Sequence, residues 1–193
     1  MTAVSVENIF KRYGDTVVFT DFSHAFERGS VTNVMGPSGC GKTTLMRLIL
    51  ELETPDAGKI TVAEGSVLAC VFQEDRLINH YSALKNVRLA MPEKNDASAK
   101  ELLDELGLSA SVHKPVKHLS GGMARRVSIA RALLSGANVI LLDEPFKGLD
   151  KKTREKVFEV IRRRTEGKTL ILITHDVTEA QYFGGETVNL KLL

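Results

Sequence analysis

The sequence predicts an α/β fold built on a core of parallel strands. Short apolar runs, of the kind that form buried strands, recur along the chain, and helical patterns with one apolar face lie between them. A glycine-rich turn, GPSGCGKTT at 36–44, joins one of these runs directly to a helical pattern. In folds of this kind ligands bind at the carboxyl ends of the parallel strands, so the functional residues are expected there.

The individual elements follow from these patterns in chain order. The N-terminal segment 4–29 predicts short strands joined by turns, which suggests an antiparallel β layer beside the core. Short apolar runs that predict strands are SVTNVM (30–35), SVLACVF (66–72), NVILLD (138–143) and TLILITH (169–175), and three of them are expected to be buried strands of the parallel sheet. Segments that predict amphipathic helices are KTTLMRLILEL (42–52), SAKELLDELGL (98–108) and KKTREKVFEVIRRRTEG (151–167). Residues about 76–118 hold no convincing strand and predict a helical insertion.

Composition narrows the class of protein. With 193 residues, 43% apolar and 26% charged, the chain is typical of one soluble globular domain, and no repeat or linker divides it. A net charge of +2 is too small to indicate binding to nucleic acid or to an acidic membrane. No apolar stretch approaches the ~20 residues of a membrane span, and no signal-peptide pattern opens the chain. The two cysteines, Cys40 and Cys70, are expected to be reduced, as in the cytoplasm.

The turn at 36–44 has the properties of a phosphate-binding loop. Its backbone N–H groups are expected to point into one concavity at a helix N-terminus, where the helix dipole favours negative charge. Lys42 can reach the β- and γ-phosphates of a nucleotide, and the Thr43 hydroxyl can ligate Mg²⁺. A chance glycine turn is the alternative, and the strand–turn–helix context argues against it. The predicted phosphate-binding residues are Gly36, Pro37, Ser38, Gly39, Cys40, Gly41, Lys42, Thr43 and Thr44.

Two further motifs suit nucleotide hydrolysis. The run NVILLDEP delivers Asp143 and Glu144 at the end of a buried strand, where Asp143 can hold the Mg²⁺ shell and Glu144 can polarise an attacking water. The alternative for this pair is a solvated acidic turn. The stretch LSGGM opens another helix, with Ser120 as N-cap followed by Gly121 and Gly122, and predicts a second anion-binding helix terminus. Alone, Ser-Gly-Gly is usually only a loop-to-helix junction.

Taken in this order, the motifs resemble those of the ATP-binding cassette (ABC) ATPases, and the resemblance covers essentially the whole chain. GPSGCGKTT resembles the Walker A loop of that family, Gln73 its Q-loop, LSGGM its signature and VILLDEP its Walker B strand. Residues 148–150 resemble the D-loop, and His175 resembles the switch histidine. Tyr13 lies where the family carries an aromatic residue that stacks on adenine. The resemblance implies a P-loop NTPase (RecA-like) core and a single ABC ATPase domain over 1–193, with a helical subdomain inserted at about 76–118.

The resemblance also implies a mechanism with ATP and Mg²⁺. Two cassettes stack head to tail, so Ser120 and Gly122 of one chain would contact the γ-phosphate held by the other. Gln73 would couple the metal and water to a partner subunit, while His175 would hold the γ-phosphate and orient Glu144. The implied catalytic residues are Glu144, His175, Lys42 and Gln73. The implied metal ligands are Thr43, Gln73 and Asp143, and the nucleotide contacts are the phosphate-binding loop, Tyr13, Ser120, Gly121 and Gly122.

Details of the motifs resemble the importers of the nitrate/sulfonate/taurine branch. Met123 replaces the usual Gln of the signature, and Lys147 and Gly148 stand where small residues usually precede Leu-Asp. The segment before the Q-loop is compact, and 176–193 leaves no room for the C-terminal regulatory domain of some importers. None of these departures removes a residue needed for hydrolysis.

The expected function is therefore that of the ATP-hydrolysing subunit of a membrane importer, peripheral at the cytoplasmic face of the membrane. The implied partners are transmembrane permease subunits, a second ATP-binding subunit in a homodimer and, indirectly, a substrate-binding protein, with no direct nucleic-acid contact. One alternative is a soluble ABC ATPase acting on nucleic acid, the ribosome or a metal-cluster scaffold. Another is exporter or lipoprotein-release duty with the same chemistry.

Overall fold

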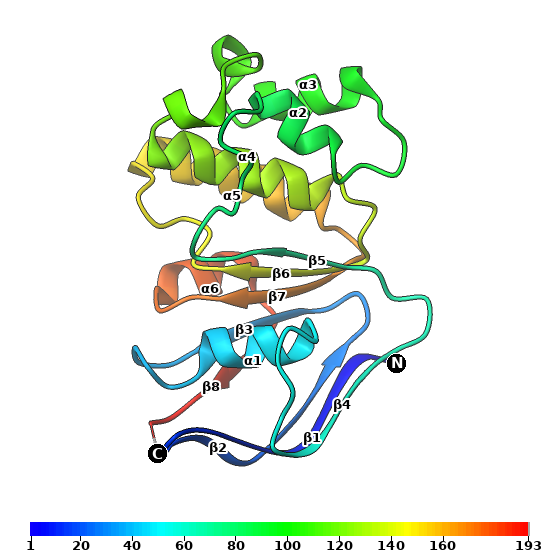
Figure 1. The fold of residues 1–193 in the computed structure, drawn as a ribbon, viewed down its shortest axis with the longest axis vertical. Helices are drawn as coiled ribbons and strands as arrows, with labels where there is room; N and C mark the ends of the chain where they lie inside the picture. The colour runs from blue at the N-terminus through cyan, green and yellow to red at the C-terminus, as the bar shows by residue number, and fades with distance from the viewer. Residues whose placement is uncertain (193) are drawn as a thin grey trace.

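The structure is a computed structural model that describes residues 1–192. The strands are β1 (Thr2–Tyr13), β2 (Thr16–Glu27), β3 (Val31–Met35), β4 (Ala57–Val62), β5 (Leu68–Val71), β6 (Val139–Asp143), β7 (Thr169–Ile173) and β8 (Glu186–Asn189). The helices are α1 (Lys42–Ile49), α2 (Ala83–Arg88), α3 (Asp96–Glu105), α4 (Gly121–Leu133), α5 (Lys151–Arg164) and α6 (Val177–Phe183). Figure 1 shows them as layers, with α2, α3, α4 and α5 above a parallel sheet, and α1 between that sheet and a second sheet below.

The central sheet is parallel and has the strand order β5-β6-β7-β3-β8. The predicted apolar runs form β3, β5, β6 and β7, so the predicted α/β core is confirmed. β6 and β7 are buried along their whole length, which explains why both read as continuous apolar runs. The edge strand β8 was not anticipated, because its sequence, ETVN, is short, polar and largely exposed.

Two hydrophobic clusters pack against opposite faces of this sheet. Ile140 and Leu142 of β6 belong to the cluster that contains the helices above, while Leu141 belongs to the cluster around α1. The alternation follows from the two-residue period of a strand. Leu45 and Met46 of α1 fill the second cluster against the strands below. The parallel sheet therefore separates two hydrophobic cores, and both of its faces are packed.

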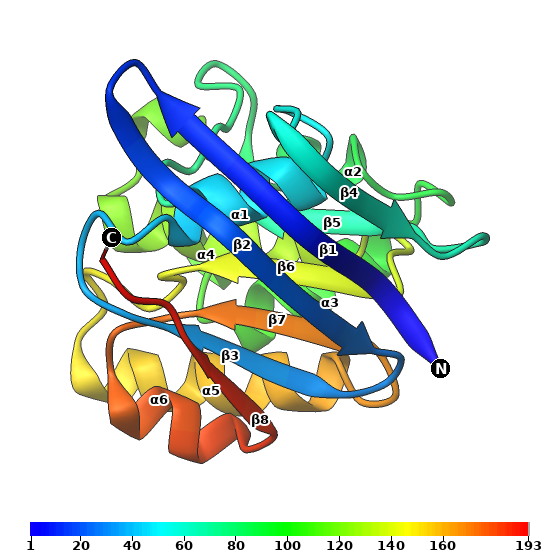
Figure 2. The ribbon, with the colours of Figure 1, turned by 90° about the horizontal axis from the view of Figure 1, so that it is seen from below.

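The prediction of several short N-terminal strands was wrong in length. The segment forms one hairpin of two 12-residue strands, β1 and β2, with β4 on the other side of β1 (Figure 2). The polar pair Glu7 and Asn8 interrupts the apolar alternation, and Asn8 has φ +49° at a shift in register. In the sequence this interruption resembles a turn, but in the structure it is a β-bulge.

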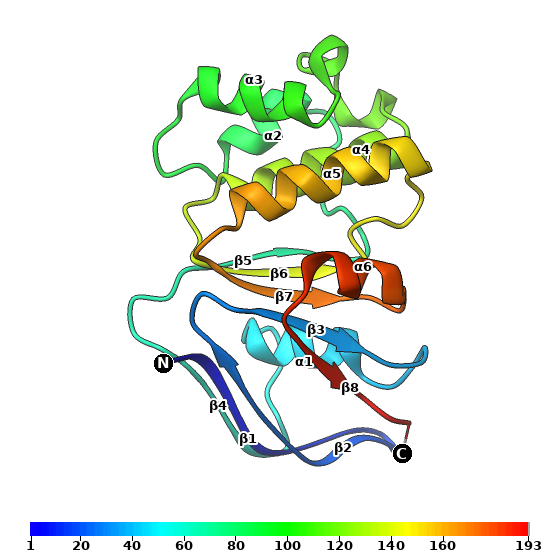
Figure 3. The ribbon, with the colours of Figure 1, turned by 180° about the vertical axis from the view of Figure 1, so that it is seen from behind.

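Residues 76–118 contain α2, α3 and two short 3-10 turns, Ser109–Ser111 and Val116–His118, which pack beside α4. The part of this segment that pairs as strand is a single isolated bridge between Ser82 and Pro115. α5 and α6 lie on the helical side of the sheet, as the view from behind shows (Figure 3). Within residues 1–192, every helix is too short or too polar to cross a lipid bilayer.

Candidate active site

A cavity of about 430 Å³ opens at the carboxyl edge of the parallel sheet. It is bounded by the phosphate-binding loop, the tip of the β1–β2 hairpin, the segment after β5, and the segments that follow β6 and β7. Its lining residues are Tyr13, Val18, Ser38, Gly39, Gly41, Lys42, Thr43, Thr44, Gln73, Asp143, Glu144, Lys147 and His175. The topology thus brings to one place most of the residues that the sequence predicted from separate motifs.

Glycines are required where the phosphate-binding loop passes close to the rest of the chain. Gly41 has φ +95° at the start of α1, and a Cβ there would lie 2.5 Å from the Val18 side chain. At Gly36 a Cβ would lie 2.5 Å from the carbonyl oxygen of Leu190 and 2.6 Å from Cys40 Sγ. A side chain at either position would push the loop out of place. The loop is therefore fixed by packing against β2 and the C-terminal segment.

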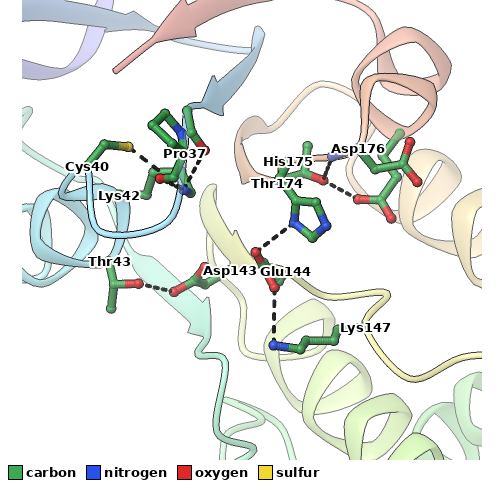
Figure 4. A network of polar contacts seen from close by, with 12 residues as sticks. Pro37, Cys40, Lys42, Thr43, Asp143, Glu144, Lys147, Thr174, His175 and Asp176 are labelled. Atoms are coloured by element: carbon green, nitrogen blue, oxygen red, sulfur yellow. Dashed lines mark hydrogen bonds and ion pairs between the residues drawn. The ribbon is translucent and has the colours of Figure 1, made fainter. Parts of the chain in front are cut away.

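The Lys42 side chain folds back onto the phosphate-binding loop and bonds its backbone. Its Nζ donates to the carbonyl oxygens of Gly36 and Pro37, each at 2.7 Å, and lies 3.8 Å from Cys40 Sγ (Figure 4). Cys40 is buried, and among the described residues Gly36, Pro37 and Cys40 do not line the cavity. The ammonium group thus braces the loop at the position where a polyphosphate chain would meet its backbone amides.

Thr43 and Asp143 bring two oxygen ligands together across the cavity floor. The Thr43 hydroxyl donates to Asp143 Oδ2 at 2.8 Å (Figure 4). Burial raises the pKa of Asp143 above its usual value, and the hydrogen bond from Thr43 acts in the opposite direction. Gln73 lines the same cavity. Among residues 1–192 no group of three or more His, Cys, Asp or Glu side chains could hold a metal by itself. The hydroxyl, carboxylate and amide oxygens fit Mg²⁺, which usually takes few protein ligands together with phosphate and water.

Glu144 is held in a strained backbone conformation beside this pair. Its φ is +45°, in a region that residues with a side chain seldom adopt and that is common at functional sites. Its Oε1 lies 2.9 Å from His175 Nδ1, and its Oε2 lies 3.7 Å from Lys147 Nζ (Figure 4). His175 directly follows β7, which neighbours β6, so adjacent strands deliver the carboxylate and the imidazole to the same point.

Tyr13 lies at the tip of the hairpin, where its ring lines the cavity. Its hydroxyl donates to Glu53, and its side chain stays half-exposed. Burial and the bond to Glu53 raise the pKa of Tyr13. A partly exposed aromatic ring at the rim of the cavity offers a flat surface to a base.

The signature residues lie apart from this cavity. Ser120 caps α4, its Oγ accepting from the Met123 N–H at 3.3 Å. A Cβ at Gly122 would lie 3.1 Å from Leu149 and 3.3 Å from the Gly148 carbonyl oxygen, which places the signature beside the segment after β6. Within residues 1–192, Ser120, Gly121 and Gly122 do not line the cavity of the phosphate-binding loop. The two glycine-rich helix termini therefore do not meet in one chain.

Sequence reasoning missed a set of contacts that hold the Q-loop segment. Arg125 is 6% exposed, donates to the carbonyl oxygens of Phe72 and Gln73, and pairs with Asp75 at 3.2 Å. Ser128 donates to the carbonyl oxygen of Asp75 at 3.2 Å. Arg131 donates to that oxygen at 3.2 Å and to the carbonyl oxygen of Arg76 at 2.9 Å. We call Arg125, Ser128 and Arg131 the α4 clasp. Their three-residue spacing on one helix face was the available signal.

Comparisons with known proteins agree with this geometry. The family described as ABC transporter matches residues 19–147. The aliphatic sulfonates import ATP-binding protein SsuB of Burkholderia thailandensis is 42% identical over 92% of this chain, which spans 55% of that relative's length. The aliphatic sulfonates import ATP-binding protein SsuB 1 of Shouchella clausii is 34% identical over 92% of this chain, and the match covers 73% of that relative's length.

A solved structure supports the same assignment. The dimeric, post-hydrolysis structure of an ATP-binding cassette bound to ADP and Pi superposes with a TM-score of 0.86 and 28% identity, covering 98% of this chain and 96% of that one. The predicted resemblance to the ABC ATPases and to their sulfonate branch is thus confirmed. The chain belongs to the ABC transporter family, as one of its ATP-binding cassettes.

Proposed function

We propose that this chain binds and hydrolyses ATP as the nucleotide-binding subunit of a membrane importer. The observation that carries the proposal is the meeting of the phosphate-binding loop, Asp143, Glu144 and His175 in one cavity. The loop would hold the phosphates through backbone amides and Lys42, and Tyr13 would stack on the base. ADP and Pi occupy the related cassette structure, which supports the same reaction here.

Thr43, Asp143 and Gln73 are the residues that would hold Mg²⁺. When bound, the ion would neutralise charge on the phosphate oxygens. Glu144 would take the proton of the attacking water, because its carboxylate lies at the cavity wall. His175 would orient that carboxylate through the 2.9 Å contact and would reach the terminal phosphate.

The separation of the signature from the cavity supports a head-to-tail homodimer. Each chain would supply a phosphate-binding loop to one site and Ser120, Gly121 and Gly122 to the other. The related cassette structure is itself dimeric. In a composite site of this kind, ATP binding would close the dimer and hydrolysis would reopen it.

The transport partner would be a transmembrane permease, with the cassette at the cytoplasmic face of the membrane and a substrate-binding protein acting indirectly. The names of the relatives support an organic sulfonate, or a solute like it, as the imported class. The chain would act as one ABC ATPase domain over 1–193, and its inserted helical segment would face the permease. On that segment Ile78 and Leu89 are 37% and 53% exposed, and Leu84, Lys85, Arg88 and Leu89 help line a groove of about 300 Å³.

A crosslinking experiment tests this role. A photoreactive residue at position 89 should capture the permease when both are expressed in membranes, while one at exposed Lys59 on β4 serves as the control. Capture from position 89 and not from 59 supports the importer. Capture from 59 alone would place the docking face elsewhere. A chain that hydrolyses ATP but never enters a permease complex would favour the alternative, a non-transport ABC ATPase.

A further inference from the structure

Lys147 is a charged residue of the cavity to which the proposed reaction assigns no role. It lies between β6 and α5, with its side chain in the same cavity as Lys42 and Thr43. Its Nζ lies 3.7 Å from Glu144 Oε2, and 58% of the side chain is exposed (Figure 4). It is therefore a flexible cation at the open side of the site, in contact with the carboxylate that would activate water.

The Glu144 carboxylate that Lys147 contacts is also held by a second residue. His175 lies against Oε1 of Glu144 and Lys147 against Oε2. Glu144 is 18% exposed and has a constrained backbone, so it cannot readily move toward a new partner. Lys147 can move, because an exposed lysine has several rotatable bonds and a loose 3.7 Å contact to give up.

We propose that Lys147 is a binding residue for the terminal phosphate of ATP, which draws it away from Glu144. The inference rests on the proposed function. A γ-phosphate carries about twice the charge of a carboxylate and so competes well for the same ammonium group. Lys42, which would also hold the phosphates, is fixed by two loop carbonyl oxygens, whereas Lys147 has one loose contact to give up. The exchange would free Glu144 Oε2 to accept a proton from water, and it would favour ATP over ADP.

Nucleotide titration in two backgrounds tests the proposal. Fluorescent analogues of ATP and ADP are titrated into the wild-type chain, Lys147→Met, Glu144→Gln and the double variant. We expect Lys147→Met to weaken ATP binding about three- to tenfold, as for one partly exposed charge pair, and ADP binding less than twofold. In the Glu144→Gln background the ATP-specific loss should be at least as large, since no carboxylate competes for the ammonium. Lys147→Arg should retain most of the affinity for ATP.

Lys152→Met is the matched control, because it removes the same charge from the exposed start of α5, outside the cavity. It should leave both affinities unchanged. Equal losses for ATP and ADP, or an ATP-specific loss that disappears in the Glu144→Gln background, would overturn the proposal and leave Lys147 as a support for Glu144 alone. If the wild-type chain binds neither ATP nor ADP, the proposed function itself fails. If the wild-type chain binds ATP but the Lys147 variants behave as described above, only the proposal for Lys147 fails.

Discussion

The chain has two glycine-rich helix starts with different surroundings. The start of α1 follows the phosphate-binding loop and, among residues 1–192, has no side chain capping it, since its N-cap residue Gly41 has no side chain. The start of α4 is capped by Ser120. Cationic and acidic side chains of the same chain surround the first, whereas the second lies beside the segment after β6 and outside the cavity.

The comparison shows that a helix terminus with free amides is only half of an anion site. Both termini carry the same dipole. At α1 the fold brings together Lys42, Asp143 and Glu144, the residues proposed for the phosphates, the metal and the water. Near the start of α4 the Nε of Arg126 donates to the Gly122 carbonyl oxygen, and the signature residues lie outside the cavity. The signature would gain a complete site only when a second chain brings its own cavity against it.

The greatest loss of activity is predicted at Glu144, the carboxylate proposed to activate water. Glu144→Gln should slow ATP hydrolysis by about two or more orders of magnitude, because the amide cannot take a proton from water. Mg-ATP binding should persist, since Asp143 and Lys42 remain, and the ATP-bound dimer should accumulate. Phosphate release and light scattering at high protein concentration measure the two effects. A variant that stays monomeric under conditions where the wild-type chain dimerises would contradict the composite site.

The next largest effect is predicted for ATP affinity at Lys42, whose ammonium group holds the phosphate-binding loop. Lys42→Ala should weaken ATP binding by about ten- to a hundredfold, because it removes a charged hydrogen-bond donor from a site otherwise made of backbone dipoles. Fluorescent-nucleotide titration measures it, with Lys59→Ala on exposed β4 as a charge-matched control. An unchanged affinity would show that Lys42 does not bind phosphate.

Mixing two inactive chains tests whether the two helix starts cooperate across a dimer. Lys42→Ala disables the α1 site, and Ser120→Arg blocks the α4 terminus. Random pairing of the two should restore up to about a quarter of wild-type activity, through dimers that keep one intact composite site. Each variant alone is the control. If mixing restores nothing at concentrations where the wild-type chain is active, the two termini do not share a site.

The smallest effect is predicted at the side-chain cap that the start of α4 has and the start of α1 lacks. Ser120→Ala should lower the free energy of unfolding by about 1 kcal/mol, the usual contribution of an N-cap. For a chain of this size that corresponds to a melting temperature lower by about 2–4 °C. Thermal unfolding followed by circular dichroism measures it, and Ser120→Asn, which keeps a capping side chain, should restore the stability. Equal melting of all three chains would mean that the cap adds nothing.

Much of the site could be predicted because its motifs are continuous in the sequence. The loop at 36–44, Asp143 with Glu144, and His175 each follow an apolar strand, and parallel strands bring such ends to one edge. The contact of Lys147 with Glu144 could not be predicted, since it depends on a side-chain direction in the fold. The spacing of the α4 clasp shows that its residues share a helix face but does not show which segment they hold. The bulge at Asn8 escaped notice because a polar interruption in a strand has the same pattern as a turn. The partners of the chain and its domain behaviour stay predictions.

The α4 clasp has a mechanical consequence. Carbonyl oxygens of the segment after β5 are fastened along the same helix that carries Ser120 at its first turn. Four of these attachments come from the guanidinium groups of Arg125 and Arg131, which are stiff and planar. The segment and the helix are therefore fastened together at several points, from Arg125 in the second turn of α4 to Arg131 near its end. We expect a displacement at Gln73 to be transmitted along α4 toward Ser120.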